Sequence, residues 1–475
     1  MSIKKIALIV LCLSTSLKVF SQSITLDPSS SSNAILDAKS NSKGLLVPRL
    51  TTAQRNAIQN PENGLLVYDT SINTMYYFNG YSWVKMENPD DAKTISSDTL
   101  DFDGSIAVSG SFLVVGLQSF SNRKGKCNIF RKTNGIWQFH SSIIANDGLN
   151  NDRFGTSVAI EGNRLVVGAT GVSSSKGAIY IFELPPLGNI WTQRNKLTAS
   201  DGVNGDSFGQ KVALSDSRIA VGVPYADDGV KFDVGKVYVF TRVVFLNTPI
   251  WNQTLLATGT KNQDNLGTSV AIFNNEVLFG VPGDDLEELF GVNDSDNGSV
   301  SLWGLNNGNW TQTQKFYSIS TYQLLKIGRN IAFNDKYIAI GSEGQYPASN
   351  FGIPVWGSVY LKMRVQNIEK LIIDTSESGI SSPETFTGFS SSLAILNDNL
   401  IIGKNQLYRG SNACIIKLNE LSNTASLASP TKYFLKTPLA YSTYGTNVCL
   451  TTDEVFIPSD TPLDGKSKLH IESID

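Results

Sequence analysis

Two short loops of this 475-residue chain place paired carboxylates where they could hold a cation. Asp147 and Asp152 enclose a glycine and three further residues, and Asp201 and Asp206 do the same. Calcium takes roughly six to eight oxygen ligands, and each loop offers carboxylate and carbonyl oxygens. An aspartate in a turn also accepts hydrogen bonds from nearby backbone, while the glycine takes a positive φ. The pairs are therefore weak candidates for metal ligands, with turn caps as the alternative.

The sequence holds no arrangement typical of a catalytic centre. Its two histidines, His140 and His470, stand in neither a Gly-x-Ser-x-Gly nor a His-x-x-His context, and both lie in segments typical of strands. We therefore expect no enzyme and no cofactor. Glycoside hydrolysis uses a pair of carboxylic acids, and when these come from distant parts of a chain they leave no local motif. A polysaccharide-active hydrolase or lyase stays an open alternative for that reason.

The elements that would position these residues form an internal repeat. Three segments share the same order of residues: an aspartate, an apolar residue followed by glycine, and a short apolar run. They are Asp152–Ile160, Asp206–Leu214 and Asp264–Ile272, and fainter copies precede and follow them. The aligned positions stand 51, 54, 58, 61, 62 and 55 residues apart, which indicates seven units of about one propeller blade each. The residues that define the repeat structurally are Phe154, Gly155, Phe208, Gly209, Gly267, Gly328 and Gly445.

Each unit is typical of four antiparallel strands. Apolar runs, an alternating strand and a strand opened by tryptophan follow one another, separated by polar turns. Four strands repeated seven times predict an all-β fold with a seven-bladed β-propeller. The last unit ends after three strands, and Lys93–Asp98 resembles Lys196–Asp201, which belongs to a fourth strand. We expect residues 93–98 to complete the last blade, so that residues 93–475 form one closed ring.

A family resemblance rests on four short motifs, Phe154-Gly155, Gly168-Ala169-Thr170, Phe208-Gly209 and Gly222-Val223-Pro224. They resemble FG-GAP repeats, which build the propellers of integrin α chains. The resemblance covers about residues 93–475 and implies a propeller whose loops bind partners on one face, often in adhesion. Integrin calcium loops join the first two strands of a blade, but the corresponding turns here have only two or three residues. Integrin-style calcium sites are therefore not expected, and calcium binding elsewhere stays open.

Long connections are predicted between the second and third strands of units three, four and five, at about residues 225–234, 283–297 and 343–355. In a four-stranded blade these connections share one face with the loops between blades, so they raise a continuous rim. Long loops on a rigid scaffold commonly carry binding residues, and tolerated surface insertions are the alternative. The rim residues are Tyr225, Asp227, Asp228, Asp284, Asp285, Phe290, Tyr346 and Phe351.

The first 22 residues are typical of a secretory signal peptide. Lys4 and Lys5 precede an apolar run, Ile6–Leu13, that is too short to span a bilayer. Of the 39 basic residues, Lys4, Lys5 and Lys18 lie in this segment, so the mature chain has 36 basic and 42 acidic residues and a net charge of −6. An acidic, exported chain is expected at the cell surface or outside the cell, without a nucleic-acid partner or a membrane span.

Residues 23–92 do not follow the repeat. Lys43–Arg55, Asn63–Asp69 and Tyr76–Trp83 resemble a short module at the N-terminus of bacterial exported and tail-fibre-like proteins. Thr51 or Thr52 can cap a helix over residues 53–59, and the rest reads as short strands. So small a β-rich module can hardly bury its apolar runs alone. We expect it to form a homo-oligomer, for example a trimer, or to pack on a partner.

These features together predict a secreted or cell-surface binding protein with a role in adhesion. Its propeller face would contact protein or glycan outside the cell, and the N-terminal module would join copies of the chain. The alternatives are the polysaccharide-active enzyme and a structural repeat protein without a dedicated ligand.

Overall fold

The computed structural model divides the chain into two compact units, Met1–Asn88 and Pro89–Asp475, and each is described by itself. The structure describes residues 46–71, 74–78, 83–85, 94–96, 105–186, 188–246, 248–284, 298–317, 326–342, 358–364, 368–373, 389–404, 412–418, 433–434, 448–452, 454–461 and 466–473.

The first unit is a small four-stranded sheet with one helix. Its first two strands pair in parallel and the others are antiparallel, in the order β1-β2-β3-β4. The elements are β1 (Arg49–Leu50), α2 (Thr52–Asn56), β2 (Leu66–Asp69), β3 (Thr74–Phe78) and β4 (Trp83–Lys85).

Helix α2 begins at a capping box. The Thr51 side chain accepts a hydrogen bond from the Gln54 amide, and the Gln54 side chain accepts one from the Thr51 amide. The helix starts one residue before the expected 53–59 and ends three residues earlier. Asn60 takes a positive φ of 48° immediately before Pro61, and both features oppose a longer helix.

A buried polar cluster holds this unit together. Asp69 is fully buried. It accepts hydrogen bonds from the Thr52 hydroxyl, from the Ser71 amide and, at 3.0 Å, from Arg55 Nε. The Arg55 guanidinium also lies 3.9 Å from the centre of the Tyr76 ring. Burial opposes ionisation of Asp69, but the bonds from Thr52 and Arg55 outweigh it and hold its pKa below the ordinary value.

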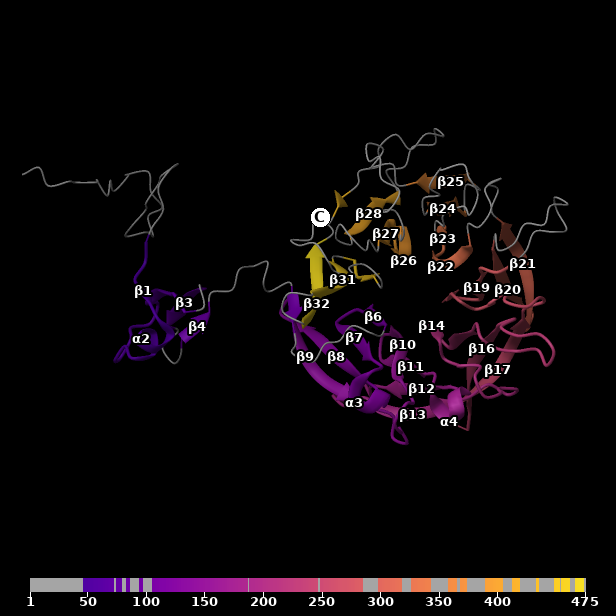
Figure 1. The fold of residues 1–475 in the computed structure, drawn as a ribbon, viewed down its shortest axis with the longest axis horizontal. Helices are drawn as coiled ribbons and strands as arrows, with labels where there is room; N and C mark the ends of the chain where they lie inside the picture. Colours follow the sequence, from indigo (N-terminus) through magenta and orange to yellow (C-terminus); the bar gives the residue numbers. More distant parts are fainter. Residues whose placement is uncertain are drawn as a thin grey trace, which may run out of the picture. The chain divides into compact units, whose positions relative to one another are not determined.

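The second unit is a seven-bladed propeller, in which each blade is a four-stranded antiparallel sheet (Figure 1). In blades one to four the strands are neighbours in chain order. They are β6 (Ile106–Ser109), β7 (Phe112–Leu117), β8 (Lys126–Thr133), β9 (Ile136–Ile143), β10 (Phe154–Glu161), β11 (Arg164–Ala169), β12 (Ala178–Glu183), β13 (Thr192–Leu197), β14 (Lys211–Ser215), β15 (Arg218–Val223), β16 (Lys236–Phe245), β17 (Thr248–Thr258), β18 (Val270–Phe273), β19 (Glu276–Val281), β20 (Ser299–Asn306) and β21 (Asn309–Tyr317).

The last blade takes its outer strand from the beginning of the unit. Strand β5 (Thr94–Ser96) pairs antiparallel with β32 (Lys466–Ser473), with Ile95 opposite Leu469. The ring is thereby closed through a sheet that joins both ends of the unit. Blades five to seven comprise β22 (Ile327–Phe333), β23 (Tyr337–Ser342), β24 (Ser358–Met363), β25 (Ile368–Ile373), β26 (Phe389–Leu396), β27 (Asn399–Lys404), β28 (Asn412–Lys417), β29 (Tyr433–Phe434), β30 (Cys449–Leu450), β31 (Glu454–Thr461) and β32 (Lys466–Ser473), with β5.

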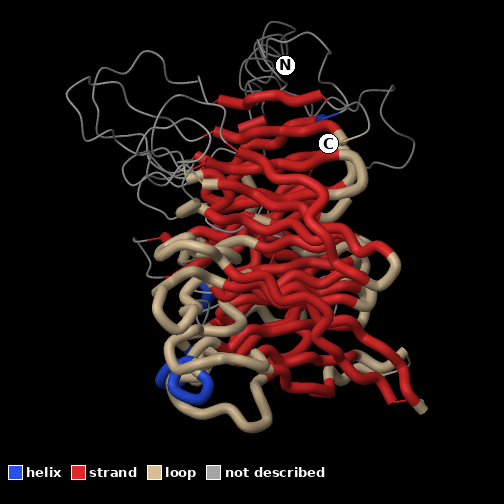
Figure 2. Tube along the Cα trace, turned by 90° about the vertical axis from the view of Figure 1, so that its right-hand side faces the viewer, coloured by secondary structure: helices blue, strands red, loops and turns tan. Residues whose placement is uncertain are grey.

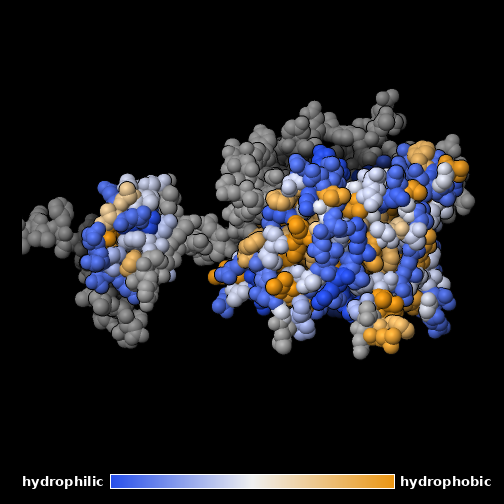
Figure 3. All heavy atoms as spheres, turned by 90° about the horizontal axis from the view of Figure 1, so that it is seen from below, coloured by the Kyte–Doolittle hydropathy of each residue, from blue (hydrophilic) through white to orange (hydrophobic). Residues whose placement is uncertain are grey.

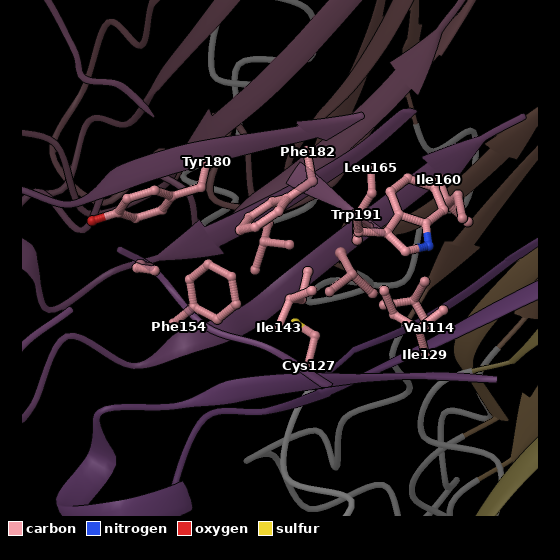
Figure 4. Packing of buried hydrophobic residues seen from close by; sticks show 14 of the residues in the cluster. Val114, Cys127, Ile129, Ile143, Phe154, Ile160, Leu165, Tyr180, Phe182 and Trp191 are labelled. Atoms are coloured by element: carbon pink, nitrogen blue, oxygen red, sulfur yellow. The ribbon is translucent and has the colours of Figure 1, made fainter. Parts of the chain in front are cut away.

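Apolar side chains of successive blades interlock around the ring. Seven apolar clusters occur among the described residues, and each joins one blade to the next. Figure 4 shows the cluster between blades one and two, where Phe154 lies among Cys127, Ile143 and Tyr180. Trp137 of blade one packs edge-on against Phe456 of blade seven, 5.4 Å between ring centres. The same chemistry therefore operates where the chain closes on itself.

The repeat motif has a stereochemical explanation. Gly155, Gly209, Gly267 and Gly328 take positive φ values of 97°, 93°, 88° and 92°. A Cβ atom on Gly168 would lie 2.1 Å from the carbonyl oxygen of Gly209 in the next blade, so the two glycines let the blades meet at backbone distance. The preceding Phe154 and Phe208 are fully buried between blades. Gly445 lies outside the described residues.

Two single-turn helices connect the second and third strands of the first two blades. They are α3 (Phe120–Arg123) and α4 (Val172–Ser175), and both contain residues with left-handed dihedrals. The Ser175 carbonyl accepts a hydrogen bond from Ser207 at 2.8 Å in the next blade. Figure 2 shows how loops lie at both ends of the stacked strands, so that each end of the ring has its own loop surface.

Candidate binding face

The loop between β15 and β16, residues 224–235, is the most completely described part of the expected rim, and we call it the blade-three loop. The Asp228 amide donates to the Lys231 carbonyl at 2.9 Å, and the Gly235 amide donates to the Ala226 carbonyl at 3.0 Å. The loop therefore folds as its own small hairpin above the blade.

The next blade fixes the blade-three loop from the side. Lys231 Nζ donates to the Thr260 carbonyl at 2.6 Å, and the Phe232 amide donates to Asn262 Oδ1 at 3.1 Å. The Gln263 amide donates to the Phe232 carbonyl at 3.0 Å. The backbone is thus held by two blades, while several side chains remain free to contact a partner.

The exposed side chains of the blade-three loop are aromatic, apolar and acidic. Tyr225, Val230 and Phe232 are 49%, 92% and 51% exposed. Asp227 and Asp228 are exposed beside them. Strands two and four of a blade end on the same side, so the loops between blades lie on this face too. Exposed apolar residues of these loops are Ile144, Leu149 and Val203, and α3 adds Phe120.

Negative charge accumulates below this loop. Burial raises the pKa of Asp206, and it outweighs the Lys236 charge and the backbone hydrogen bonds that favour the ionised carboxylate. Burial likewise raises the pKa of Asp233, with a contribution from Asp227. The Asp233 amide donates to Asp227 Oδ1 at 2.9 Å, which places the two acids in one turn. The face therefore combines apolar contact surface with a negative potential.

The structure assigns different roles to the rim residues. Tyr225, Asp227 and Asp228 share the blade-three loop and face solvent. Asp284 of blade four instead binds Lys315 Nζ at 2.6 Å and Ser299 Oγ at 2.5 Å, so it ties β20 and β21 to the loop. The remaining rim residues lie outside the described part of the chain: Asp285, Phe290, Tyr346 and Phe351.

The paired carboxylates are bonded within the protein. Asp152 accepts a hydrogen bond from the Leu149 amide at 2.7 Å, and Asp206 accepts one from the Val203 amide at 2.9 Å, as turn caps do. Lys196 binds Asp147 at 2.6 Å. This geometry favours the turn-cap interpretation of both pairs.

Asp201 also has two close partners. Lys236 Nζ approaches it at 2.7 Å, and the Tyr238 hydroxyl donates to it at 2.6 Å. Partial burial works against ionisation, but these two partners hold the pKa of Asp201 below its ordinary value. The ammonium occupies the position that a cation would need at this carboxylate.

Blade four contains a buried aspartate that sequence reasoning did not single out. Asp264 is 2% exposed and accepts hydrogen bonds from the Thr260 and Lys261 amides, both at 2.7 Å. Burial raises its pKa, and Asp284 contributes to the rise. Its place in the repeat, matching Asp152 and Asp206, was the available signal. Within the described ranges, no three side chains of His, Cys, Asp or Glu gather as a metal site requires.

Of the histidines, only His140 can be described in full. Its ring nitrogens lie 2.9 Å from Ser141 Oγ and 2.9 Å from Asn189 Oδ1. These contacts link β9 to the following blade. His470 pairs with Thr94 in the strand ladder of the last blade. No described helix is both long and apolar enough to cross a membrane.

Comparison with known proteins found family matches for two parts of the chain. Residues 25–100 match the phage tail like trimerisation region, and residues 137–182 and 191–240 match the FG-GAP repeat. No curated protein sequence matches the chain. The trimerisation match suggests a homo-oligomer.

Two solved structures illustrate distant similarity. Sqt1 from Saccharomyces cerevisiae is 10% identical with a TM-score of 0.43, over 80% of this chain and 100% of that chain. The WD40 domain of Pan2 from Neurospora crassa is 9% identical with a TM-score of 0.44, over 80% and 94%. The fold assignment rests on the sheet topology and the repeats instead. The chain thus consists of a phage-tail-like trimerisation region followed by a β-propeller that contains FG-GAP repeats.

Proposed function

We propose that this chain is a secreted or cell-surface binding protein, whose propeller offers the face with the blade-three loop to a protein or glycan outside the cell. The observation that carries the proposal is the exposure of Tyr225, Val230 and Phe232 on a loop fastened by two blades. A loop that is already ordered loses little conformational entropy when a partner binds. Its aromatic and apolar contacts can then contribute most of their energy to affinity.

The chemistry of the face restricts its partner. Tyr225 and Phe232 provide flat apolar surfaces, which suit either an apolar protein patch or the face of a sugar ring. Asp227, Asp228 and Asp233 surround them with negative charge. A partner with cationic groups beside an apolar surface would be steered to this face and would bind more weakly at high salt.

The N-terminal region would increase the strength of such binding. Three propellers joined through a trimerisation region present the same face three times. Linked sites bind a multivalent surface more tightly than one site does, because the second contact is intramolecular. A weak individual contact is therefore sufficient for adhesion. The proposed export, based on the apolar run Ile6–Leu13, would place the trimer where such surfaces are found.

Glycan and matrix-protein arrays, probed with the full chain in calcium and in chelator, test the proposal. We expect Tyr225→Ala combined with Phe232→Ala to weaken binding about tenfold or more, as loss of anchor residues does. Phe139→Ala is the matched control, because Phe139 is 60% exposed on the outer strand β9. If Phe139→Ala weakens binding as much as the double variant does, the assignment of the binding face is contradicted. Released sugars would support the enzyme, and no binding under either condition would support a structural role.

A further inference from the structure

The hairpin of β16 and β17 ends in an apolar tip, which we define as residues 243–246 and 249–250. Val244, Phe245 and Leu246 are 63%, 66% and 83% exposed, and Val243 and Ile250 are each 40% exposed. The strands that carry it have 10 and 11 residues. Figure 3 shows apolar surface projecting at the lower edge of the propeller.

The corresponding hairpins of blades one and four end differently. Blade one turns through Asn134 and Gly135, and blade four turns through Asn307 and Gly308, all with positive φ. Such two-residue turns close a hairpin with polar residues and no projecting tip. Blade three has Leu246 at this place, so its apolar character is not a requirement of the blade architecture.

Both faces of the tip are apolar. Val243 lies opposite Ile250 in the ladder, so these two side chains and Phe245 share one face. Val244 lies opposite Pro249 on the other face. A hairpin that docks on one flat partner needs one apolar face only. A hairpin with two apolar faces suits a position between two neighbours.

A three-fold assembly supplies that position. Each chain in a cyclic trimer touches two others through two different surfaces. We propose that the tips of three propellers meet in a homotrimer, with each tip packed between the tips of the two other copies. This inference rests on the proposed trimer, and it adds a second contact to that made by the N-terminal region.

The size of the contact agrees with a tethered arrangement. A stable interface between free proteins buries about 1,600 Å², far more than one hairpin tip provides. Tethering changes this requirement, because a short link raises the effective concentration to roughly the millimolar range. Only residues 86–93 separate β4 of the N-terminal unit from β5 of the propeller. The tip contact can therefore form within a trimer that the N-terminal region already holds together. By itself, the contact is too small to hold three free chains together.

Cysteine crosslinking of the full chain tests this contact. Under mild oxidation, Val244→Cys should give at least about tenfold more disulfide-linked dimer than Ile136→Cys. Ile136 is 53% exposed on the corresponding hairpin of blade one, and both variants keep the native cysteines. Equal crosslinking of the two variants, or none, would overturn the proposal.

Light scattering on the same samples separates the two levels of the inference. If the chain is a trimer but Val244→Cys does not crosslink, the tip contact is contradicted and the proposed trimer stands. If the chain is a monomer, both are contradicted. Phe245→Ser with Leu246→Ser provides a second measurement: the trimer should persist with a larger radius of gyration by X-ray scattering. An unchanged radius would contradict the contact. Binding of the wild type to phosphatidylcholine vesicles, abolished by this double variant, would assign the tip to lipid instead.

Discussion

Each of the two units has its own kind of stabilising contact, apolar in the propeller and charged in the N-terminal unit. In the propeller, an apolar cluster joins each blade to the next, with side chains such as Phe154 and Phe208 fully buried. In the N-terminal unit, Val67 is the one apolar side chain among the described residues that is fully buried. The charged pair Arg55 and Asp69 occupies the place where an apolar core would be expected.

This difference indicates how each unit depends on others. A propeller blade is supported by two neighbours, and the closed ring leaves no blade with one neighbour only, so the loss of one contact is shared. Among its described residues, the N-terminal unit has one buried ion pair, and it exposes Leu46, Leu66 and Tyr77. A buried charge pair contributes little net stability when intact, but removing one partner leaves an uncompensated charge. Stability of this unit should therefore come from association of copies.

The largest expected effect is the loss of the N-terminal fold in Asp69→Asn. The substitution removes the partner of the buried Arg55 guanidinium and keeps the size of the side chain. Hydrogen exchange at pH 7 should show β2 and β3 losing protection while propeller peptides stay unchanged. Glu62→Gln, which removes an exposed charge in the same unit, is the control and should have no effect. Retained protection in Asp69→Asn would show that apolar contacts, not this pair, hold the unit.

Acid should reproduce this change in the wild type. The pKa of Asp69 is lowered, so its contribution to stability is present above the ordinary value of 3.8 and is lost as the pH falls through the lowered value. Pepsin digestion below pH 4 can follow the transition, with cleavage between residues 49 and 85 as the readout. Cleavage that begins in the propeller would mean that the propeller, and not the N-terminal unit, is the less stable unit in acid.

The next prediction concerns the apolar interfaces. Phe154→Ala should lower the free energy of unfolding of the propeller by about 3–5 kcal/mol, because it leaves a cavity between blades one and two. Phe139→Ala, at an exposed site on β9, should change it by no more than about 0.5 kcal/mol. Urea denaturation measures both. Similar losses for the two variants would mean that the interface is not the main source of stability.

Much of the propeller could be predicted because its repeat obeys stereochemical rules that act locally. A glycine with positive φ follows the buried phenylalanine at Gly155 and Gly209, and this pattern is visible without any contact information. The outer strand of the last blade was also accessible, since Lys93–Asp98 resembles Lys196–Asp201. Such features depend on residue type and order alone.

The binding face was only partly accessible from the sequence. Tyr225 was singled out from loop length, but Val230 and Phe232 were missed, because their exposure depends on how the loop docks on residues 260–263 of the next blade. The apolar tip around Leu246 was missed because an apolar run within a predicted strand reads as core. The first case depends on contacts between residues about thirty positions apart.

The smallest predicted effect separates two reasons for glycine in the repeat. Gly209→Ala must accept a φ of 93° and place its Cβ 2.7 Å from the Ala178 carbonyl oxygen of the preceding blade. Gly205→Ala, four residues earlier, must accept a φ of 99° with no atom within 4 Å. Strain of the backbone alone costs roughly 1–3 kcal/mol, so Gly205→Ala should lie in this range and Gly209→Ala above it. The difference between their urea midpoints then measures the close approach of two blades, and equal midpoints would mean that the dihedral angle alone requires glycine there.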